Sequence, residues 1–316
     1  MQITYREAAE FLRNNDNYYI LTHGTPDGDT IGSGFGLCGI LRKMGKKANV
    51  YCSDPLPRRY DFMYEGYEEL PFEAKTIVAV DVADPKLLGQ KLSVYKDKVD
   101  LCIDHHISHT GYAARTLVEP DAAAACQVIY RLLSEEKLTE PDTHIAQCLY
   151  TGMATDTGCF RFDSTSPETH IAAAELMRYD IEAGKINRRM FEQKSKARLA
   201  VEQYILGNIE YYFEDRCAVA AVTLEEMAAT GLPADEFEGL ASLTTLLETV
   251  EVGVIIRQKE EHKFKVSMRS AGDTDVSELC RRFGGGGHVK AAGCTFETTL
   301  EDAKKQVLEA LSELFT

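Results

Sequence analysis

Aspartate and histidine residues follow short apolar runs at four places in this chain. The runs at 18–22, 76–80 and 101–103 read as β-strands, and a helical pattern at 143–155 precedes the fourth place. In an open α/β sheet the carboxyl ends of parallel strands line one crevice, so we expect these side chains to lie together. Oxygen and imidazole ligands suit a divalent cation such as Mn²⁺, whereas a thiolate zinc site is built from cysteine ligands. The residues are His23, Asp27, Asp29, Asp81, Asp104, His105, His106 and Asp156.

Six of these residues form a candidate set of ligands for two divalent cations. Asp81 is the candidate bridge, because a carboxylate has two oxygens. Two cations about 3.5–4 Å apart activate water and stabilise the leaving oxygen of an in-line displacement, which predicts a two-metal hydrolase. The expected cations are Mn²⁺, with Mg²⁺ or Co²⁺ as alternatives. The six residues are His23, Asp27, Asp29, Asp81, His105 and Asp156.

Each of these patterns also has an ordinary structural interpretation. An HxxxDxD sequence in a turn is usually capping and Asx-turn chemistry, and a lone His-His pair is more often a surface or core detail. Under those interpretations, acidic residues and histidines would occur at the four places for four unrelated reasons. One metal site explains all four places in the order in which a doubly wound sheet presents them, and metal binding is therefore favoured.

Composition narrows the class of protein. The chain has 316 residues, 44% of them hydrophobic and 27% charged, which is typical of a globular protein with room for two domains. A net charge of −15 argues against binding of long duplex nucleic acid. The nine cysteines include no CxxC pair, and no apolar run approaches the ~20 residues of a membrane span. We expect a cytoplasmic protein that does not contact membranes, with a homodimer as an open alternative to a monomer.

The periodicity predicts an α/β fold with two domains. Residues 1–184 alternate strand and helix patterns, which predicts a doubly wound parallel sheet with strands at 18–22, 48–52, 76–81, 99–104 and 115–118. Expected helices lie at 30–44, 122–134, 143–155 and 167–179. Residues 185–211 are charged and helical in pattern and are interpreted as a connecting helix, although a surface helix of the first domain fits nearly as well.

The remainder of the chain, residues 212–316, reads as a smaller α+β domain that faces the first across a cleft. Its expected strands lie at 217–223, 250–258, 263–269 and 292–296, and its expected helices at 276–283 and 300–314. A glycine run at 284–287, followed by His288 and Lys290, separates the first of these helices from the last strand. Alone, a tetraglycine run is most often a flexible link.

The four motifs together resemble those of the DHH family of phosphoesterases, named for the triplet Asp104-His105-His106. The resemblance implies one metal on His23, Asp27 and Asp81, and a second on Asp29, Asp81, His105 and Asp156. It further implies catalytic roles for Asp81, for His106, which would face the substrate phosphate, and for Asp104, which would orient a ligand imidazole.

The second half resembles the DHHA1 domain, in which a glycine loop, its histidine and an arginine at a strand end hold the substrate. Glycines let backbone N–H groups approach an anion closely. The resemblance implies substrate contacts from Ser267, Arg269, Gly285, Gly286, Gly287 and His288.

The resemblance extends over essentially the whole chain and is strongest to the stand-alone nanoRNase and pAp phosphatase group. It implies cleavage of short oligoribonucleotides or dinucleotides such as pApA to 5′-mononucleotides, and removal of phosphate from pAp. Alternatives are a polyphosphate or pyrophosphate phosphatase and, in another class, a non-catalytic nucleotide or RNA binder. The chain departs from the group pattern at His109, where asparagine is usual, and at Ala122–Ala125, Cys126 and Gln127.

Overall fold

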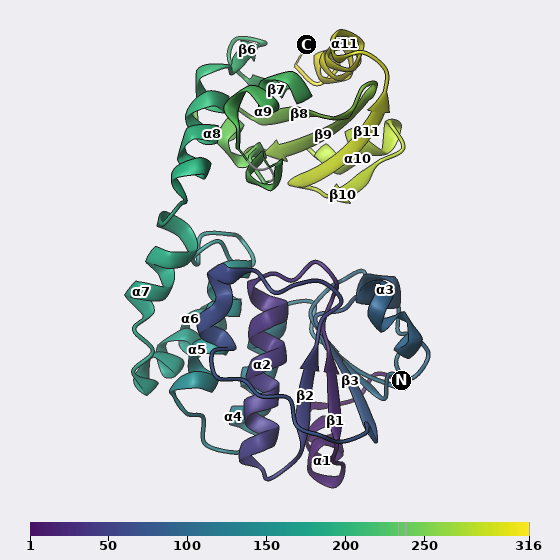
Figure 1. Cartoon of the computed structure of the whole chain (residues 1–316), viewed down its shortest axis with the longest axis vertical. Helices are drawn as coiled ribbons and strands as arrows, with labels where there is room; N and C mark the ends of the chain where they lie inside the picture. Colours follow the sequence, from purple (N-terminus) through teal and green to yellow (C-terminus); the bar gives the residue numbers. More distant parts are fainter. Residues whose placement is uncertain (233, 238, 316) are drawn as a thin grey trace. The chain divides into compact units, whose positions relative to one another are not determined.

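Two separate sheets organise the chain, as the computed structural model shows for residues 1–232, 234–237 and 239–315 (Figure 1). Each sheet belongs to its own compact unit, Met1–Gln193 and Lys194–Thr316. The division falls inside the segment that we expected to connect two domains. The side chain of His288 lies outside the described part of the chain.

The first unit is built on five parallel strands in the order β2-β1-β3-β4-β5. The strands are β1 (Tyr18–Leu21), β2 (Ala48–Tyr51), β3 (Thr76–Val80), β4 (Leu101–Asp104) and β5 (Arg115–Val118). Every residue of β3 and β4 is buried, as expected for parallel strands that are covered on both faces. The chain leaves β1 toward β2 and returns to β3 on the other side of β1. The strand order therefore reverses between β1 and β3, where such sheets bind ligands.

Helices α2 and α5 of this unit pack against each other through glycines. A Cβ atom on Gly32 would lie 2.5 Å from the carbonyl oxygen of Cys148, and one on Gly152 would lie 2.8 Å from Oδ1 of Asp29. Larger residues would force the two helices apart. The α-helices of the unit are α1 (Tyr5–Asn14), α2 (Gly28–Lys43), α3 (Gly89–Leu92), α4 (Ala125–Glu135), α5 (Thr143–Asp156), α6 (Pro167–Leu176) and α7 (Ala183–Asn187). Short 3₁₀ turns lie at Arg58–Met63, Pro85–Leu88, Ser93–Tyr95 and Met177–Tyr179.

The second unit contains a mixed sheet in the order β10-β11-β9-β8-β7-β6. Its strands are β6 (Glu210–Tyr212), β7 (Cys217–Val222), β8 (Val252–Glu260), β9 (Lys263–Ser270), β10 (Gly286–His288) and β11 (Ala291–Glu297). β7 and β8 are parallel, and the other pairs are antiparallel. Its α-helices are α8 (Lys196–Gly207), α9 (Leu224–Thr230), α10 (Val276–Arg282) and α11 (Leu300–Ser312), with 3₁₀ turns at Ala234–Phe237 and Ala241–Thr245.

The two faces of β9 differ in character because side chains alternate along a strand. Phe264, Val266 and Met268 are buried in the core that includes residues of α10 and α11. Lys265 and Ser267, together with Arg269, line a cavity with residues of β8 and of the 3₁₀ turn at Ala241–Thr245. The strand thus presents a polar row on one side of the sheet.

The parallel sheet and the separate α+β unit confirm the expected fold class. Three local features differ from expectation. The glycine run forms part of strand β10, paired with β11, instead of a loop. The connecting segment is not one helix, since α7 passes into a π-helical turn at Arg188–Glu192 and a new helix, α8, begins after the N-cap Ser195. Helix α1 has a capping box at Thr4 and Glu7 that the sequence analysis missed.

Candidate metal centre

The eight acidic and imidazole residues singled out in the sequence lie at one edge of the parallel sheet. β1, β3 and β4 are neighbours, and His23, Asp81 and His105 follow their carboxyl ends. Asp27 is the N-cap of α2, and Asp156 is the last residue of α5. The topology therefore brings together residues that lie far apart in the sequence.

Three of these residues form one group of possible ligands. Nε2 of His23 lies 3.7 Å from Oδ2 of Asp27 and 3.5 Å from Oδ2 of Asp81. One ligand atom from each residue lies within 4.8 Å of those of the other two. Asp27 also accepts the N–H groups of Asp29 and Thr30, so its second oxygen is fixed while the first faces the histidine.

A second group adjoins the first through Asp81. Nε2 of His105 lies 3.8 Å from Oδ2 of Asp29, 3.7 Å from Oδ1 of Asp81 and 3.4 Å from Oδ2 of Asp156. Asp29, His105 and Asp156 again offer ligand atoms within 4.8 Å of one another. Oδ1 of Asp81 also lies 3.6 Å from Nδ1 of His106, so Asp81, His105 and His106 form a third group of possible ligand atoms. The two oxygens of Asp81 thus face different histidines, which is the arrangement that a bridging carboxylate requires.

The charge of this cluster fits divalent cations. Burial and the neighbouring carboxylates raise the pKa of Asp81 well above its ordinary value, and burial raises that of Asp29. Oδ1 of Asp81 is buried without a hydrogen-bond partner among the described residues. A buried carboxylate oxygen is stable only when it is paired, protonated or bound to a metal. Bound cations would meet that need for Asp81 and would balance the buried charge of Asp29, so the residues fit the metals that the resemblance implies.

Asp81 also has an unusual backbone. It follows β3 with φ +58°, in the left-handed region that few residues other than glycine adopt and that asparagine and aspartate tolerate best among them. Its N–H donates to the carbonyl of Ile103 at the end of the adjacent strand, which holds the conformation in place. Such strain is most common at functional sites.

Helix α4 contributes a support for Asp29 that the sequence analysis missed. The backbone N–H groups of Ala125 and Cys126 donate to the two carboxylate oxygens of Asp29, at 2.7 and 2.9 Å. An anion at a helix N-terminus is stabilised by the free N–H groups there. The positions at which this chain departs from the group pattern, Ala122–Ala125 and Cys126, therefore include the two residues that contact the carboxylate of Asp29. They make this contact through backbone N–H groups. Gln127 accepts from the N–H of Ala123 and the hydroxyl of Thr169, a buried structural role.

The two histidines of the triplet have different partners. Nδ1 of His105 bonds the carbonyl of Ala122 at 3.2 Å, so its proton lies there and Nε2 is left as a ligand atom. Nδ1 of His106 lies 2.8 Å from Oδ1 of the fully buried Asp104. This hydrogen bond raises the pKa of His106 to about 9. Asp104 therefore orients the ring of His106, whereas it contacts His105 only through the backbone N–H.

Removal of metal should destabilise the protein more at higher pH. Burial and nearby carboxylates raise the pKa of Asp156 to about 8. An acid whose pKa is raised by folding stabilises the metal-free protein when protonated, and this contribution falls as pH rises from about 4 through about 8. Bound cations remove the need for that proton. We expect the fall in Tm caused by chelator to be larger at pH 8 than at pH 6. Asp156→Asn should reduce this difference, and an equal or greater difference in that variant would contradict the assignment.

Ser267 and Arg269 lie together in the second unit. They line a cavity of about 220 Å³ whose other polar residues include Arg257 and Lys265. Burial lowers the pKa of Arg269, and among the described residues no carboxylate forms an ion pair with it. A partly buried guanidinium without an anion is typical of a site for phosphate or carboxylate.

The glycine run packs closely on β11. A Cβ atom on Gly285 would lie 2.2 Å from the carbonyl oxygen of Gly293, and Gly287 has φ +144°, which favours glycine. Residue 288 pairs with Ala291, and Ala291 pairs with Arg269. The backbone of residue 288 is therefore two strands, about 10 Å, from that of Arg269. The expected substrate residues thus lie on β9 and at β10, two strands that are separated by β11.

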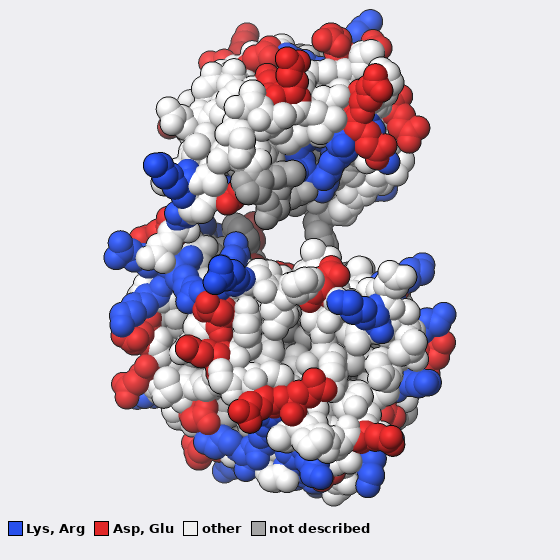
Figure 2. All heavy atoms as spheres, viewed as in Figure 1, with Lys and Arg blue, Asp and Glu red and all other residues white. Residues whose placement is uncertain are grey.

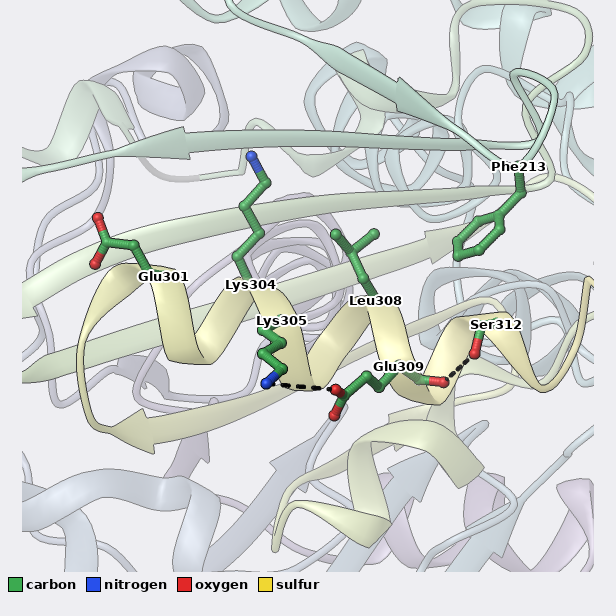
Figure 3. Close-up of a pocket in the computed structure, with 7 residues that line it drawn as sticks. All are labelled: Phe213, Glu301, Lys304, Lys305, Leu308, Glu309 and Ser312. Carbon is green, nitrogen blue, oxygen red and sulfur yellow. Dashed lines mark hydrogen bonds and ion pairs between the residues drawn. The ribbon is translucent and has the colours of Figure 1, made fainter.

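A hollow of about 500 Å³ along α11 is of a different kind (Figure 3). Leu308 and Phe213 line it, and three of its four charged lining residues form ion pairs: Lys304 with Glu210, and Lys305 with Glu309. The fourth is Glu301, and the lining contains no histidine, whereas the cluster at the parallel sheet brings several carboxylates and imidazoles together. We assign the chemistry to that cluster.

Comparison with known proteins agrees with this geometry. The DHH family, N-terminal domain, matches residues 17–153, and the DHHA1 domain matches residues 215–316. The bifunctional oligoribonuclease and PAP phosphatase NrnA of Thermus thermophilus is 35% identical over 98% of this chain and 94% of that protein. The chain belongs to the DHH family of phosphoesterases. The expected recognition, and with it the class of hydrolase, is confirmed.

Other similar proteins show how far the likeness extends. NrnA of Bacillus subtilis is 25% identical over 89% of each chain. The crystal structure of an exopolyphosphatase-related protein from Bacteroides fragilis has a TM-score of 0.90 and 27% identity, and the match covers 98% of this chain and 96% of that one. RecJ of Thermus thermophilus, solved with Mn²⁺, shares only the fold, with a TM-score of 0.53 and 15% identity over 98% of this chain and 55% of that one.

Proposed function

We propose that this DHH protein is a two-metal phosphohydrolase that cleaves short oligoribonucleotides and linear dinucleotides, such as pApA, to 5′-mononucleotides, and that removes the 3′-phosphate from pAp. The observation that carries the proposal is the position of Asp81, whose one oxygen faces His23 of the first ligand group and whose other oxygen faces His105 of the second. The substrate class is supported by the NrnA relative, which matches nearly the full length of both chains.

The proposed ligands follow the two groups: His23, Asp27 and Asp81 for one cation, and Asp29, Asp81, His105 and Asp156 for the other. Bound cations of this kind polarise phosphoryl oxygens and lower the pKa of water. Carboxylate and imidazole ligands favour Mn²⁺ over a thiolate-bound metal. Burial raises the pKa of the nearby thiol of Cys126, so that this cysteine stays protonated.

The protein's own residues would bind and orient the phosphate. The side chain of His106 is 31% exposed and is fixed by Asp104 through Nδ1. Its other ring nitrogen is left for a phosphate oxygen, where a protonated imidazole stabilises the negative charge that develops during displacement. Arg269, Ser267 and the glycines 285–287 would bind the part of the substrate that is distal to the scissile bond. His288 keeps the same predicted role.

The surface charge supports short substrates. The net charge is −15, and acidic and basic side chains are interspersed on the face shown in Figure 2. Affinity for long nucleic acid depends on the number of phosphates that basic residues neutralise. The cavity beside Arg269 has a volume of about 220 Å³, which suits a small anionic group and not a long strand.

A second candidate function is hydrolysis of polyphosphate or pyrophosphate. The likeness to the exopolyphosphatase-related protein of Bacteroides fragilis supports this function as the alternative. The two functions differ in product, because dinucleotides yield nucleoside monophosphates and polyphosphate yields orthophosphate. A hydrolysis panel with Mn²⁺ should compare pApA, longer RNA, pAp, cyclic dinucleotides and polyphosphate. We expect the highest kcat/KM with pApA, and preference for polyphosphate would replace the proposal with the second function.

A non-catalytic nucleotide or RNA binder is the candidate from another class. A binding module has no need for two adjoining ligand groups with a carboxylate, that of Asp81, between them. Chelation distinguishes the two possibilities. Turnover should disappear when metal is removed and return when Mn²⁺ is restored, whereas a binder would show no turnover in either state.

Arg269→Ala should weaken dinucleotide hydrolysis selectively. A charge-assisted hydrogen bond to phosphate contributes about 1.5–3 kcal/mol, which corresponds to about a ten- to hundredfold loss in kcat/KM for pApA, mainly through KM. Hydrolysis of bis-p-nitrophenyl phosphate should be nearly unchanged, because that small diester lacks the distal part. Arg282→Ala, which removes an exposed arginine paired with Glu313, is the matched control. An equal loss with both substrates would contradict the proposed role of Arg269.

The cellular setting remains a prediction. All nine cysteines are free thiols, in agreement with the expected cytoplasm. No helix in the described ranges is long and apolar enough to cross a membrane. The homodimer that the sequence analysis left open is tested by sedimentation of the intact protein.

A further inference from the structure

Two buried polar atoms near the triplet face each other without a hydrogen-bond partner among the described residues. They are Oδ2 of Asp104 and Nε2 of His109, and they lie 4.0 Å apart. Asp104 is fully buried, and the side chain of His109 is 5% exposed. A buried carboxylate oxygen and a buried ring nitrogen are each unfavourable when unpaired. A shift of about 1 Å would bring them to hydrogen-bond distance and satisfy both.

The other ring nitrogen of His109 determines where its proton lies. Nδ1 accepts the backbone N–H of Gly111 at 3.0 Å. A backbone amide is always a donor, so Nδ1 carries no proton, and the neutral ring is protonated at Nε2. Burial lowers the pKa of His109, in agreement with a neutral ring. Nε2 is therefore a donor that points toward an acceptor, Oδ2 of Asp104.

The segment after the triplet holds the ring of His109 in this place. The ring stacks on Tyr112 at 5.5 Å between centroids, and the hydroxyl of Tyr112 donates to Sγ of Cys102. The N–H of His109 donates to the carbonyl of His106, and the N–H of Thr110 donates to Ala83. The ring thus lies between the triplet and the turn that follows it, so it has little freedom to reach another acceptor.

We propose that His109 is a positioning residue, which donates from Nε2 to Oδ2 of Asp104 and so fixes the carboxylate that orients His106. Oδ1 of Asp104 already accepts from Nδ1 of His106 and from the N–H of His105. Oδ2 has no hydrogen bond among the described residues, so rotation of the carboxylate is restrained at one oxygen only. A donor on each oxygen removes that rotation. The inference rests on the proposed function, in which His106 binds the substrate phosphate.

The resemblance implies asparagine at this position, and the chain has His109. The contacts of His109 with Asp104 and Gly111, and not that difference, support its positioning role. Its effect should appear in kcat, since the orientation of His106 matters most in the transition state, and the metal ligands do not contact the ring of His109.

The test replaces His109 by phenylalanine and by glutamine. His109→Phe keeps a ring that can stack on Tyr112 but removes the donor, whereas His109→Gln places an amide N–H near the position of Nε2. Partners that orient active-site groups typically contribute about 10- to 100-fold. We expect His109→Phe to lower kcat for pApA about tenfold with little change in KM or metal content. His109→Gln should recover most of the loss, and equal kcat values in the two variants would overturn the inference.

A double-mutant cycle separates positioning from general stability. In a His106→Ala background, His109→Phe should cause no further loss of kcat, because the group that it positions is absent. A tenfold loss in that background would show that His109 acts through the fold and would overturn the inference. Thermal unfolding of each variant identifies loss of folded protein.

A readout without turnover distinguishes failure of this inference from failure of the proposed function. Long-range ¹H–¹⁵N NMR of the histidine rings reports whether Nδ1 of His106 carries its proton toward Asp104. We expect this signal to broaden or shift in His109→Phe and to be restored in His109→Gln. An unchanged His106 signal in both variants would overturn the positioning role, whatever substrate the enzyme hydrolyses.

Discussion

Replacement of Asp81 by asparagine is expected to abolish hydrolysis and to lower the metal content of the purified protein. The oxygens of Asp81 face His23 on one side and His105 on the other, so the loss of its charge weakens both ligand groups. Charge stabilisation by metals contributes several kcal/mol to such reactions, which corresponds to at least about a thousandfold in rate. Asparagine is preferred to alanine here because it tolerates the left-handed backbone of this position.

The measurements are turnover of pApA with Mn²⁺ and metal content after dialysis. Asp54→Asn is the matched control, because Asp54 is exposed in the same unit. It should retain both turnover and metal. An Asp81→Asn protein with unchanged metal content and turnover within tenfold of the unsubstituted enzyme would contradict the bridging role.

The positions of the proposed metal ligands could be predicted because each follows a strand or lies at one end of a helix. Parallel strands leave their carboxyl ends at one edge, so the types of residue at 23, 81 and 105 were enough to predict that they meet. The apolar runs of the strands also identified the parallel sheet itself. The order of the strands in the sheet, and not the local conformation of each residue, determines that these residues lie together.

The supports of the centre could not be predicted in the same way. Asp29 is held by backbone N–H groups of α4, which any sequence at Ala125 and Cys126 offers equally. Gly152 is required by the distance between a Cβ atom and Asp29, a contact that local sequence does not record. His109 was visible only as a departure, and its role depends on a tautomer that Gly111 imposes. The break before α8 could have been suspected from Ser195, a good N-cap residue within a helical pattern.

Substitution of the two adjacent histidines of the triplet should have different effects on kcat and on metal content. His106→Ala is expected to lower kcat by about 10²–10³, as for the loss of one donor to the transition state, with no loss of metal. Its Nδ1 is engaged by Asp104, and the ring is partly exposed, so it is suited to bind phosphate. His105→Ala is expected to lose metal, because Nε2 of His105 faces three of the carboxylates.

Metal content and single-turnover rates, measured at saturating Mn²⁺ and at limiting Mn²⁺, distinguish the two roles. Excess Mn²⁺ should restore part of the activity of His105→Ala, since mass action refills a weakened site. It should not restore His106→Ala, whose defect lies in the orientation and charge of the group at the phosphate. His262→Ala, which removes an exposed histidine of the second unit, is the control and should leave both quantities unchanged. If both triplet variants lost metal equally, Asp104 would be orienting a ligand and not a phosphate-binding group, and the division of roles between His105 and His106 would be wrong.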